Sequence, residues 1–484
     1  MNKLLLSSIL LTNFFGCKAD VFDNIKPSTN LTWTPCFDSF GCSKLEVPVD
    51  YSNKSLGTTS IAFLKLTGKN ATVDSPSIIV LPGGPGGSGI DLLLSSATLA
   101  EQALGSQYNI ISFDPRGVKN SGLTLDCFSG NAEARSAFTR LHSTGPTNVS
   151  TTSLEEQFQS SAIYGEWCNE AVKTNSPYGY YVTTPTVARD LLSFIETEAR
   201  AAGRPASDAK LWAYGISYGT ITGSTFASMF PDRVGRMVLD GLVDAEDYYS
   251  NLWAGNVDQM DEGMAEFSRL CHAAGPEKCA FWGSDPANIT ARIDKIIEQF
   301  QNRPVPFSGV GNRTLPAMAT YSDLKALFLN ALYIPLSMFP VMANVLQQIE
   351  SGNASGLVGR YDGLNATIDA RLAVMCADSS RTNKLTTLEE FKSFVEFAVS
   401  ESKYVGDVWP IYVDQILCRG MQIELPDSMM VQGPIEAQGN KTTAFPILFT
   451  SNTIDPITPL KSARTMSSRF ANSVLLQQEA VGVS

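Results

Sequence analysis

Ser217 stands between two glycines in the run Gly215-Ile216-Ser217-Tyr218-Gly219. An apolar run at 210–214 predicts a strand before it, and a helical pattern follows at 220–230. A sharp turn between a strand and a helix exposes a serine hydroxyl as a nucleophile, and flanking glycines let the two elements approach without Cβ clashes. Since so short a pattern also occurs by chance, the strand–turn–helix context carries the prediction. The alternative interpretation is a glycine-rich turn with a bystander serine.

A second glycine-rich segment, Leu81-Pro82-Gly83-Gly84-Pro85-Gly86-Gly87-Ser88-Gly89, directly follows the apolar run 77–81. Backbone N–H groups in such a loop can converge on an oxyanion. In a serine site of this kind the second donor is the residue after the nucleophile. We therefore predict an oxyanion hole formed by Gly84 and Tyr218. A phosphate loop and a flexible linker are the alternatives, and the Gly-Lys-Ser/Thr ending of a phosphate loop is absent.

Asp455 lies in the segment Asn-Thr-Ile-Asp-Pro-Ile-Thr-Pro at 452–459, after a predicted strand at 445–449. In the chain order serine, acid, histidine, the acid follows a late strand and orients the histidine. We predict this role for Asp455. An Asx turn is the alternative, since Asp-Pro often begins a turn. Arg116, in Asp114-Pro115-Arg116-Gly117, is expected to pair with a carboxylate beside the site in a structural role.

Short apolar runs alternate with helical patterns, which predicts an α/β fold with a mostly parallel central sheet. Helices are predicted at 186–201 and 220–230. Eight strands are predicted, at 45–51, 60–66, 77–81, 108–113, 210–214, 236–239, 445–449 and 473–477.

Residues 245–440 separate two parts of this predicted sheet and carry helix-like patterns and four cysteines. We predict a cap domain here, inserted into a core made of residues 20–244 and 441–484. Two consecutive domains are the alternative. That arrangement would leave residues 445–477 too short to fold alone.

The first residues predict a secretory signal segment at 1–19. Lys3 is followed by a largely apolar stretch at 4–15 and by small residues around Cys17-Lys18-Ala19. The alternative is an uncleaved anchor. Nine Asn-x-Ser/Thr sequons fit a glycosylated, secreted chain, at Asn30, Asn53, Asn70, Asn148, Asn288, Asn312, Asn353, Asn365 and Asn440.

Nine cysteines are present, and all but Cys17 follow the predicted signal segment. An even number in an oxidising compartment favours disulfides. A zinc site is the rival interpretation, but no CxxC pair occurs. Proximity suggests the pairs Cys36–Cys42 and Cys271–Cys279, and more weakly Cys127–Cys168 and Cys376–Cys418.

The formal net charge of the 484 residues is −12, with 44% hydrophobic and 17% charged residues. This balance is typical of a globular chain and argues against nucleic acid or an anionic membrane surface as a partner. Composition predicts no oligomeric state.

Taken together, several segments resemble the secreted α/β hydrolases of the proline iminopeptidase and tripeptidyl aminopeptidase family. They are Trp33 with Pro35-Cys36, the LPGGPGGSG loop, FDPRG, GISYGT and DPITPL near the end. The resemblance implies an α/β-hydrolase fold with helices on both faces of the sheet and a mainly helical cap. It also implies removal of N-terminal residues or short peptides through an acyl-enzyme on Ser217, with no metal or organic cofactor.

The acidic residues that open the predicted cap, Asp244, Glu246 and Asp247, are candidate ligands for the α-ammonium group of such a substrate. This assignment is based on their place directly after Leu239-Asp240-Gly241. A small-molecule ester or amide is the alternative substrate.

One position departs from the family. Members usually follow the last strand with Gly-His-Cys, whereas Val483 stands at the histidine position here. We expect a chain truncated before its catalytic histidine; a binding protein without turnover and a base borrowed from elsewhere are the alternatives. His142 and His272 lack the required chain order, so both are expected to be ordinary core or surface residues.

Overall fold

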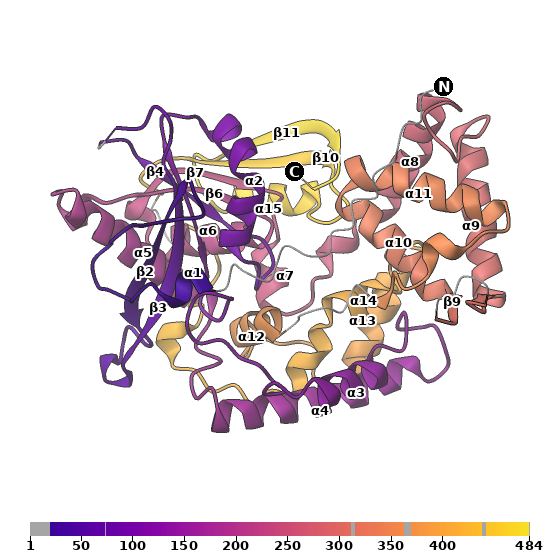
Figure 1. Cartoon of the computed structure of the whole chain (residues 1–484), viewed down its shortest axis with the longest axis horizontal. Helices are drawn as coiled ribbons and strands as arrows, with labels where there is room; N and C mark the ends of the chain where they lie inside the picture. Colours follow the sequence, from indigo (N-terminus) through magenta and orange to yellow (C-terminus); the bar gives the residue numbers. More distant parts are fainter. Residues whose placement is uncertain (1–19, 73, 311–314, 363–368, 438–441, 484) are drawn as a thin grey trace.

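A nine-stranded sheet forms the centre of the computed structural model, which describes residues 20–72, 74–310, 315–362, 369–437 and 442–483 (Figure 1). The predicted signal segment lies outside the described residues. The strand order is β1-β2-β3-β5-β4-β6-β7-β10-β11. The strands are β1 (Thr34–Cys36), β2 (Phe40–Pro48), β3 (Thr58–Leu66), β4 (Ser77–Leu81), β5 (Asn109–Asp114), β6 (Leu211–Ile216), β7 (Val234–Asp240), β10 (Ile447–Ile454) and β11 (Val474–Val481).

All pairings from β5 to β11 are parallel, while β1, β2, β3 and β5 pair antiparallel. The predicted mostly parallel sheet and all eight predicted strands are therefore confirmed, with shifted ends. Of the nine strands in this sheet, only β1 was missed by the sequence analysis. Its three residues are too few to give a periodic signal.

Both faces of the sheet are buried, as alternate residues of β3 show. Ile61 and Phe63 belong to the larger apolar cluster, and Ala62 and Leu64 to a smaller one on the other face. Helix α2 (Gly89–Leu104) covers the smaller cluster, whereas α5 (Thr184–Ala201) and α6 (Tyr218–Met229) cover the larger one. Helix α15 (Leu460–Ser468) connects β10 to β11.

Residues between β7 and β10 form a mainly helical layer, with one small hairpin of β8 (Val305–Phe307) and β9 (Ala317–Ala319). In Figure 1, α8 to α11 lie on the right of the view, and β2 to β7 lie on the left. The exact domain boundaries stay a prediction. The helices are α7 (Ala245–Tyr249), α8 (Met260–Ala274), α9 (Pro286–Asn302), α10 (Tyr321–Tyr333), α11 (Pro335–Glu350), α12 (Asp369–Asp378), α13 (Leu388–Glu401) and α14 (Trp409–Val413).

Helices α3 (Ala132–His142) and α4 (Ser153–Thr174) precede Ser217 in the chain but run along α12, α13 and α14 (Figure 1). A Cβ added to Gly420 would lie 3.1 Å from the Cα of Gly165 in α4, so the two backbones touch. These two helices therefore extend the helical layer in space, although the predicted core includes them by sequence.

The structure forms all four predicted disulfides: Cys36–Cys42, Cys127–Cys168, Cys271–Cys279 and Cys376–Cys418. The asparagines of six sequons lie in the described residues and all six are exposed; Asn312, Asn365 and Asn440 lie outside them. Among the helices of the described residues, none is long and apolar enough to cross a bilayer.

A fully buried ion pair ties β2, β5 and α5 together. Arg116, just after β5, forms two hydrogen bonds to Asp190 of α5, of 2.5 and 2.7 Å. Nη2, which is one of the donors to Asp190, also donates to the Pro48 carbonyl, and Nη1 donates to the Val49 carbonyl, at 2.7 Å each. Tyr51 also donates to Asp190, at 2.8 Å. Arg116 thus has the carboxylate partner expected from sequence, in a structural position.

Replacing Asp190 with alanine should leave Arg116 as an uncompensated buried charge. Breaking such a pair costs about 3–5 kcal/mol. The matched control is Asp427→Ala, which removes the exposed pair with Arg381 and should cost at most about 1 kcal/mol. Urea denaturation followed by tryptophan fluorescence measures both, and equal losses would contradict the structural role of Asp190.

Candidate active site

Ser217 occupies a strained turn between β6 and α6. Its backbone angles are φ 54° and ψ −123°, a region that residues with a Cβ rarely adopt. Its N–H donates to the Asp240 carbonyl at 3.0 Å, and its own carbonyl accepts from the Thr220 N–H at 2.8 Å. The turn is therefore held from both β7 and α6. It leaves the Ser217 side chain half-buried at the carboxyl end of the sheet.

The two glycines around Ser217 are required by close packing. A Cβ on Gly215 would lie 2.7 Å from the Gly219 carbonyl oxygen. A Cβ on Gly219 would overlap the carbonyl oxygen of Leu81 in β4. Helix α6 can therefore approach β4 and β6 only with glycine at both positions, as the sequence pattern indicates.

The glycine-rich loop after β4 runs beside the nucleophile. A Cβ on Gly83 would lie 3.8 Å from the Ser217 Oγ. The loop is held by buried Asp114, which accepts from Ser88 Oγ at 2.5 Å and from the Ile90 N–H at 3.2 Å. Among the loop glycines, Gly83 is the one whose Cβ position meets the Ser217 side chain, and the predicted donor Gly84 is its exposed neighbour. Which loop N–H faces an oxyanion stays a prediction.

Tyr218 supplies the first N–H of α6, which has no acceptor within the helix. This N–H is therefore free of the helix hydrogen-bond pattern, and its role as the second oxyanion donor stays a prediction. Its phenol is buried and forms a 2.6 Å hydrogen bond with Thr184 Oγ1.

Asp455 is fully buried directly after β10. Its carboxylate accepts from the N–H groups of Ile457 and Thr458, at 3.0 and 2.8 Å, and from Thr458 Oγ1 at 2.8 Å. The turn considered as the alternative is therefore present. It does not exclude the acid role, because a carboxylate offers about four acceptor positions.

The sheet brings Ser217 and Asp455 to the same end of its parallel strands. Ile216 of β6 pairs with Asp240 of β7, and Asp240 pairs with Thr450 of β10. Asp240 also accepts a hydrogen bond of 2.5 Å from Thr450 Oγ1, which ties β7 to β10. Since the strands are parallel, the residues that follow β6 and β10 emerge at one end, two strands apart.

Gln259, just before α8, holds the Asp455 turn. Its Oε1 accepts from the N–H groups of Asp455 and Leu460, at 3.3 and 3.2 Å, and its Nε2 donates to the Thr453 carbonyl at 3.0 Å. Sequence analysis missed this residue. A lone glutamine ahead of a helix gives no signal of a contact almost 200 residues away.

The end of β11 returns toward Asp455. The Gly482 N–H donates to the Ile454 carbonyl at 3.0 Å, and Asn452 Nδ2 donates to the Gly482 carbonyl at 2.8 Å. Gly482 is therefore fixed to β10, the strand that leads into Asp455, and position 483 is the next residue. Val483 packs there against the main apolar cluster.

Both histidines have other partners. His142 is buried, with Nδ1 2.7 Å from Ser160 Oγ and Nε2 2.7 Å from Asp414 Oδ1, so both ring nitrogens are in use. His272 is 3.0 Å from the Gly283 carbonyl through Nδ1, and its ring stacks on Trp282. These contacts agree with the expectation that they are ordinary structural residues.

The three acidic residues proposed for the substrate ammonium group differ in their partners. Asp244 caps α7 by accepting from the Glu246 N–H at 2.9 Å. Asp247 accepts from the Gly255 N–H at 2.8 Å, and burial raises its pKa to about 6. Glu246 is exposed, forms a 3.0 Å ion pair with Arg469, and lines a cavity of about 700 Å³. Of the three, Glu246 is the most accessible to a ligand.

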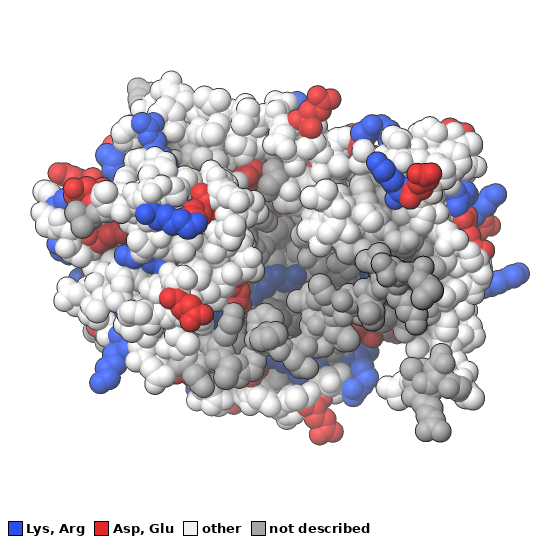
Figure 2. Space-filling view, turned by 45° about the horizontal axis from the view of Figure 1, so that its top comes forward, with Lys and Arg blue, Asp and Glu red and all other residues white. Residues whose placement is uncertain are grey.

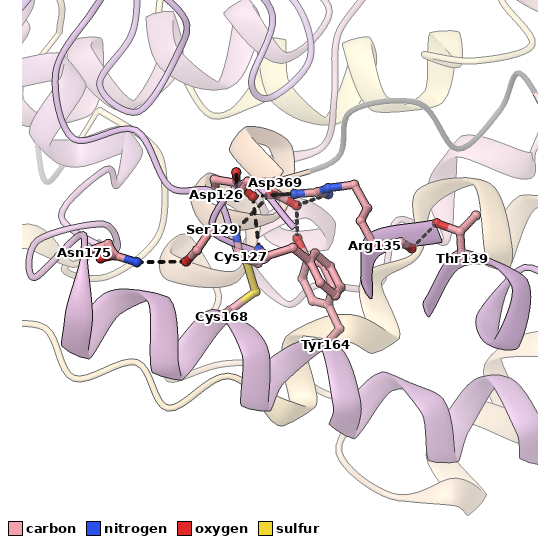
Figure 3. A network of polar contacts seen from close by, with 11 residues as sticks. Asp126, Cys127, Ser129, Arg135, Thr139, Tyr164, Cys168, Asn175 and Asp369 are labelled. Atoms are coloured by element: carbon pink, nitrogen blue, oxygen red, sulfur yellow. Dashed lines mark hydrogen bonds and ion pairs between the residues drawn. A yellow bond between two sulfur atoms is a disulfide. The ribbon is translucent and has the colours of Figure 1, made fainter. Parts of the chain in front are cut away.

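A cluster of polar contacts around buried Asp369 fixes the first residue of helix α12 (Figure 3). Asp369 accepts from the Cys127 N–H at 3.0 Å and from the Tyr164 hydroxyl at 2.7 Å. Arg135 of α3 forms an ion pair with the same carboxylate. The start of α12 is thus attached to α3, α4 and the Cys127–Cys168 disulfide.

The last residue of α12 is fixed against the core. Asp378 is buried and accepts from the N–H and hydroxyl of Thr184, at 2.7 and 2.5 Å, and from the Tyr248 hydroxyl at 2.7 Å. Burial raises the pKa of Asp378 to about 7. Since Thr184 also contacts Tyr218, this carboxylate links α12 to the residue next to the nucleophile. Its partners are distant in sequence, so sequence analysis did not identify it.

Comparison with known proteins agrees with this geometry. A family model described as alpha/beta hydrolase fold matches residues 76–277, a span that includes β4 to β7, the glycine-rich loop and Ser217. The chain has the α/β-hydrolase fold. A second model, described as TAP-like protein, matches residues 410–483, which include Asp455. The predicted fold class is confirmed, and the two matches together support a TAP-like α/β hydrolase.

Curated relatives of this α/β hydrolase cover most of the chain. Serine protease Hip1 of Mycobacterium tuberculosis (strain CDC 1551 / Oshkosh) is 26% identical over 475 residues, covering 92% of this chain and 83% of the relative. Putative hydrolase YuaR of Escherichia coli (strain K12) is 24% identical over 457 residues, covering 90% and 80%. Tripeptidyl aminopeptidase of Streptomyces coelicolor (strain ATCC BAA-471 / A3(2) / M145) is 32% identical over 225 residues, covering 45% and 38%.

Replacing Gly219 with alanine should destabilise the hydrolase, because the new Cβ overlaps the Leu81 carbonyl. Overpacking of this kind costs about 1–3 kcal/mol or more. Gly41→Ala is the control, since its Cβ would meet Trp33 at an ordinary 3.5 Å. The denaturation midpoint measures both. A Gly219→Ala variant as stable as Gly41→Ala would contradict the close packing of α6 on β4.

Replacing Val483 with histidine should place an imidazole beside Asp455. A positioned general base contributes roughly 10²–10⁴-fold to a rate, so phosphonylation of Ser217 by a fluorophosphonate should be faster by at least roughly tenfold. Leu476→His, on the exposed side of β11, is the control and should not change the rate. Equal rates for the two variants would show that position 483 does not serve Ser217.

Proposed function

We propose that this α/β hydrolase is a serine peptidase that removes N-terminal residues or short peptides through an acyl-enzyme on Ser217. The strained turn at Ser217, with Gly83 of the glycine-rich loop beside its Oγ, is the observation that carries the proposal. The relatives named serine protease and tripeptidyl aminopeptidase support peptides as the substrate class.

In the proposed reaction the Ser217 Oγ attacks the scissile carbonyl carbon, and its proton passes to a general base and then to the departing amine. His142 and His272, which have other partners, are not assigned the role of this base. The N–H groups of Tyr218 and Gly84 stabilise the oxyanion that forms. Water then attacks the ester carbon and releases the N-terminal product, returning the proton to Ser217. Asp455 orients the base and stabilises its charged form.

Exopeptidase action requires recognition of the substrate α-ammonium group. Glu246 is the preferred candidate, because its carboxylate is exposed at a cavity, while those of Asp244 and Asp247 accept backbone hydrogen bonds. An acidic side chain is favoured next to an ammonium group by direct charge attraction.

We also propose that the protein is secreted and glycosylated. Four disulfides support an oxidising compartment, and the six described sequon asparagines are all accessible to modification.

A binding protein without turnover is a second candidate. It is favoured by the contacts of His142 and His272, which engage both imidazoles with partners other than the nucleophile. Serine is a weak nucleophile at neutral pH unless a base activates it.

Incubation with a fluorophosphonate, followed by mass spectrometry, tests the nucleophile. The expected result is one adduct at Ser217, which is lost in Ser217→Ala and kept in the surface control Ser95→Ala. Peptides with a free N-terminus should be cleaved, and their N-acetylated counterparts should not. An adduct elsewhere would overturn the proposal. Absence of any adduct, with peptide binding that survives Ser217→Ala, would favour the binding protein.

A further inference from the structure

Arg371 in the first turn of α12 lies against the glycine-rich loop. A Cβ on Gly86 would lie 2.6 Å from the Arg371 nitrogen and 2.8 Å from its Cα. Gly83 of the same loop stands beside the Ser217 Oγ. Because Asp369 and Asp378 fix both ends of α12, the backbone of Arg371 has a defined place next to the nucleophile loop.

On its other side, Arg371 contacts an aromatic pair near Asp455. Its Nη1 donates to the Tyr412 carbonyl at 3.0 Å, and its guanidinium carbon lies 5.9 Å from the centroid of the Tyr412 ring. The Tyr412 ring meets that of Tyr333 edge to face, at 5.5 Å between centroids. Burial raises the pKa of the Tyr333 phenol; the charge of Arg371 opposes this rise and that of Asp455 adds to it. Arg371 therefore lies between the Ser217 loop and the surroundings of Asp455.

The guanidinium has no acidic partner within the described part of the chain. Arg116 and Arg135 pair with Asp190 and Asp369, whereas no described carboxylate forms an ion pair with Arg371. Its Nε is buried without a hydrogen-bond partner among the described residues. Buried polar groups are nearly always paired, and the exceptions often mark functional positions.

Figure 2 shows a hollow between the lobe that holds the sheet and the lobe that holds α8 to α11. Arg371 is half-buried, and a cation in such surroundings is partly shielded from water, which strengthens its attraction for an anion. The planar guanidinium also offers its two terminal nitrogens as donors to a carboxylate, because Nη1 uses only one of its two hydrogens on the Tyr412 carbonyl.

We propose that Arg371 binds a carboxylate of the peptide substrate next to the scissile bond, so that this site prefers acidic peptides. The proposal rests on the proposed peptidase function and adds a substrate class to it. The carboxylate can come from an Asp or Glu side chain or from the C-terminus of a short peptide. Both present the same planar anion to Arg371, and matched peptides distinguish them.

The test measures binding in the Ser217→Ala background by calorimetry, so it needs no turnover. Three tetrapeptides are compared: Ala-Ala-Gln-Ala amide, Ala-Ala-Glu-Ala amide and Ala-Ala-Gln-Ala acid. One of the two carboxylate peptides should bind roughly tenfold or more tightly than the neutral amide, the scale of a charge-assisted bidentate contact. Whichever is favoured identifies the source of the carboxylate.

Adding Arg371→Gln should remove this preference, whereas Arg371→Lys should keep part of it. Arg360→Gln is the control, because Arg360 is another half-buried arginine of the helical layer, and its hydrogen bond within the described residues goes to the Gly356 carbonyl. Thermal unfolding is measured to check that each variant is folded. If Arg371→Gln is not folded, Arg371→Lys is compared in its place and should show a weakened preference. A preference that survives Arg371→Gln would overturn the proposal, and so would equal or undetectable binding of all three peptides. Fluorophosphonate labelling of Ser217 tests the nucleophile of the proposed peptidase in a separate experiment.

Discussion

The site depends on one steric constraint, the close approach of α6 to the ends of β4 and β6. The positive φ of Ser217 is costly for a residue with a Cβ, and only surrounding structure maintains it. That structure is the contact of Gly219 with the Leu81 carbonyl and the hydrogen bond from the Ser217 N–H to Asp240. The strain turns Ser217 out of the strand, and the same contact brings the loop that begins at Pro82 alongside it.

The helical layer shares an apolar cluster with this framework and is also attached to it by polar contacts at both ends of α12. Asp369 and Asp378 are buried carboxylates at the two ends of α12, and each accepts hydrogen bonds from residues that precede Ser217 in the chain. Apolar packing alone would tolerate small rotations of a helix, whereas hydrogen bonds to buried carboxylates have defined directions. The polar attachment therefore fixes the position of Arg371 relative to the glycine-rich loop.

Sequence analysis succeeded where the signal is local. Buried strands such as β4 and β5 are continuous apolar runs, and the turn at Ser217 needs glycines at fixed spacing, so both are visible in a short window. Cysteine proximity likewise gave all four disulfides. Asp378, by contrast, meets Thr184 across 194 residues, and Gln259 meets Asp455 across 196. No periodicity or motif records such contacts, because they arise only when the helical layer folds back onto the sheet.

The overall charge and the proposed subsite act in opposite directions on an acidic peptide. A net charge of −12 repels such a peptide. At physiological salt this repulsion is weak beyond the Debye length of about 8 Å, because ions screen it. A half-buried guanidinium acts at contact, where water and ions screen it less. Preference for acidic peptides would therefore arise after the encounter, from the fit of a carboxylate to Arg371. For that reason the position of α12 matters more to specificity than the summed charge of the surface.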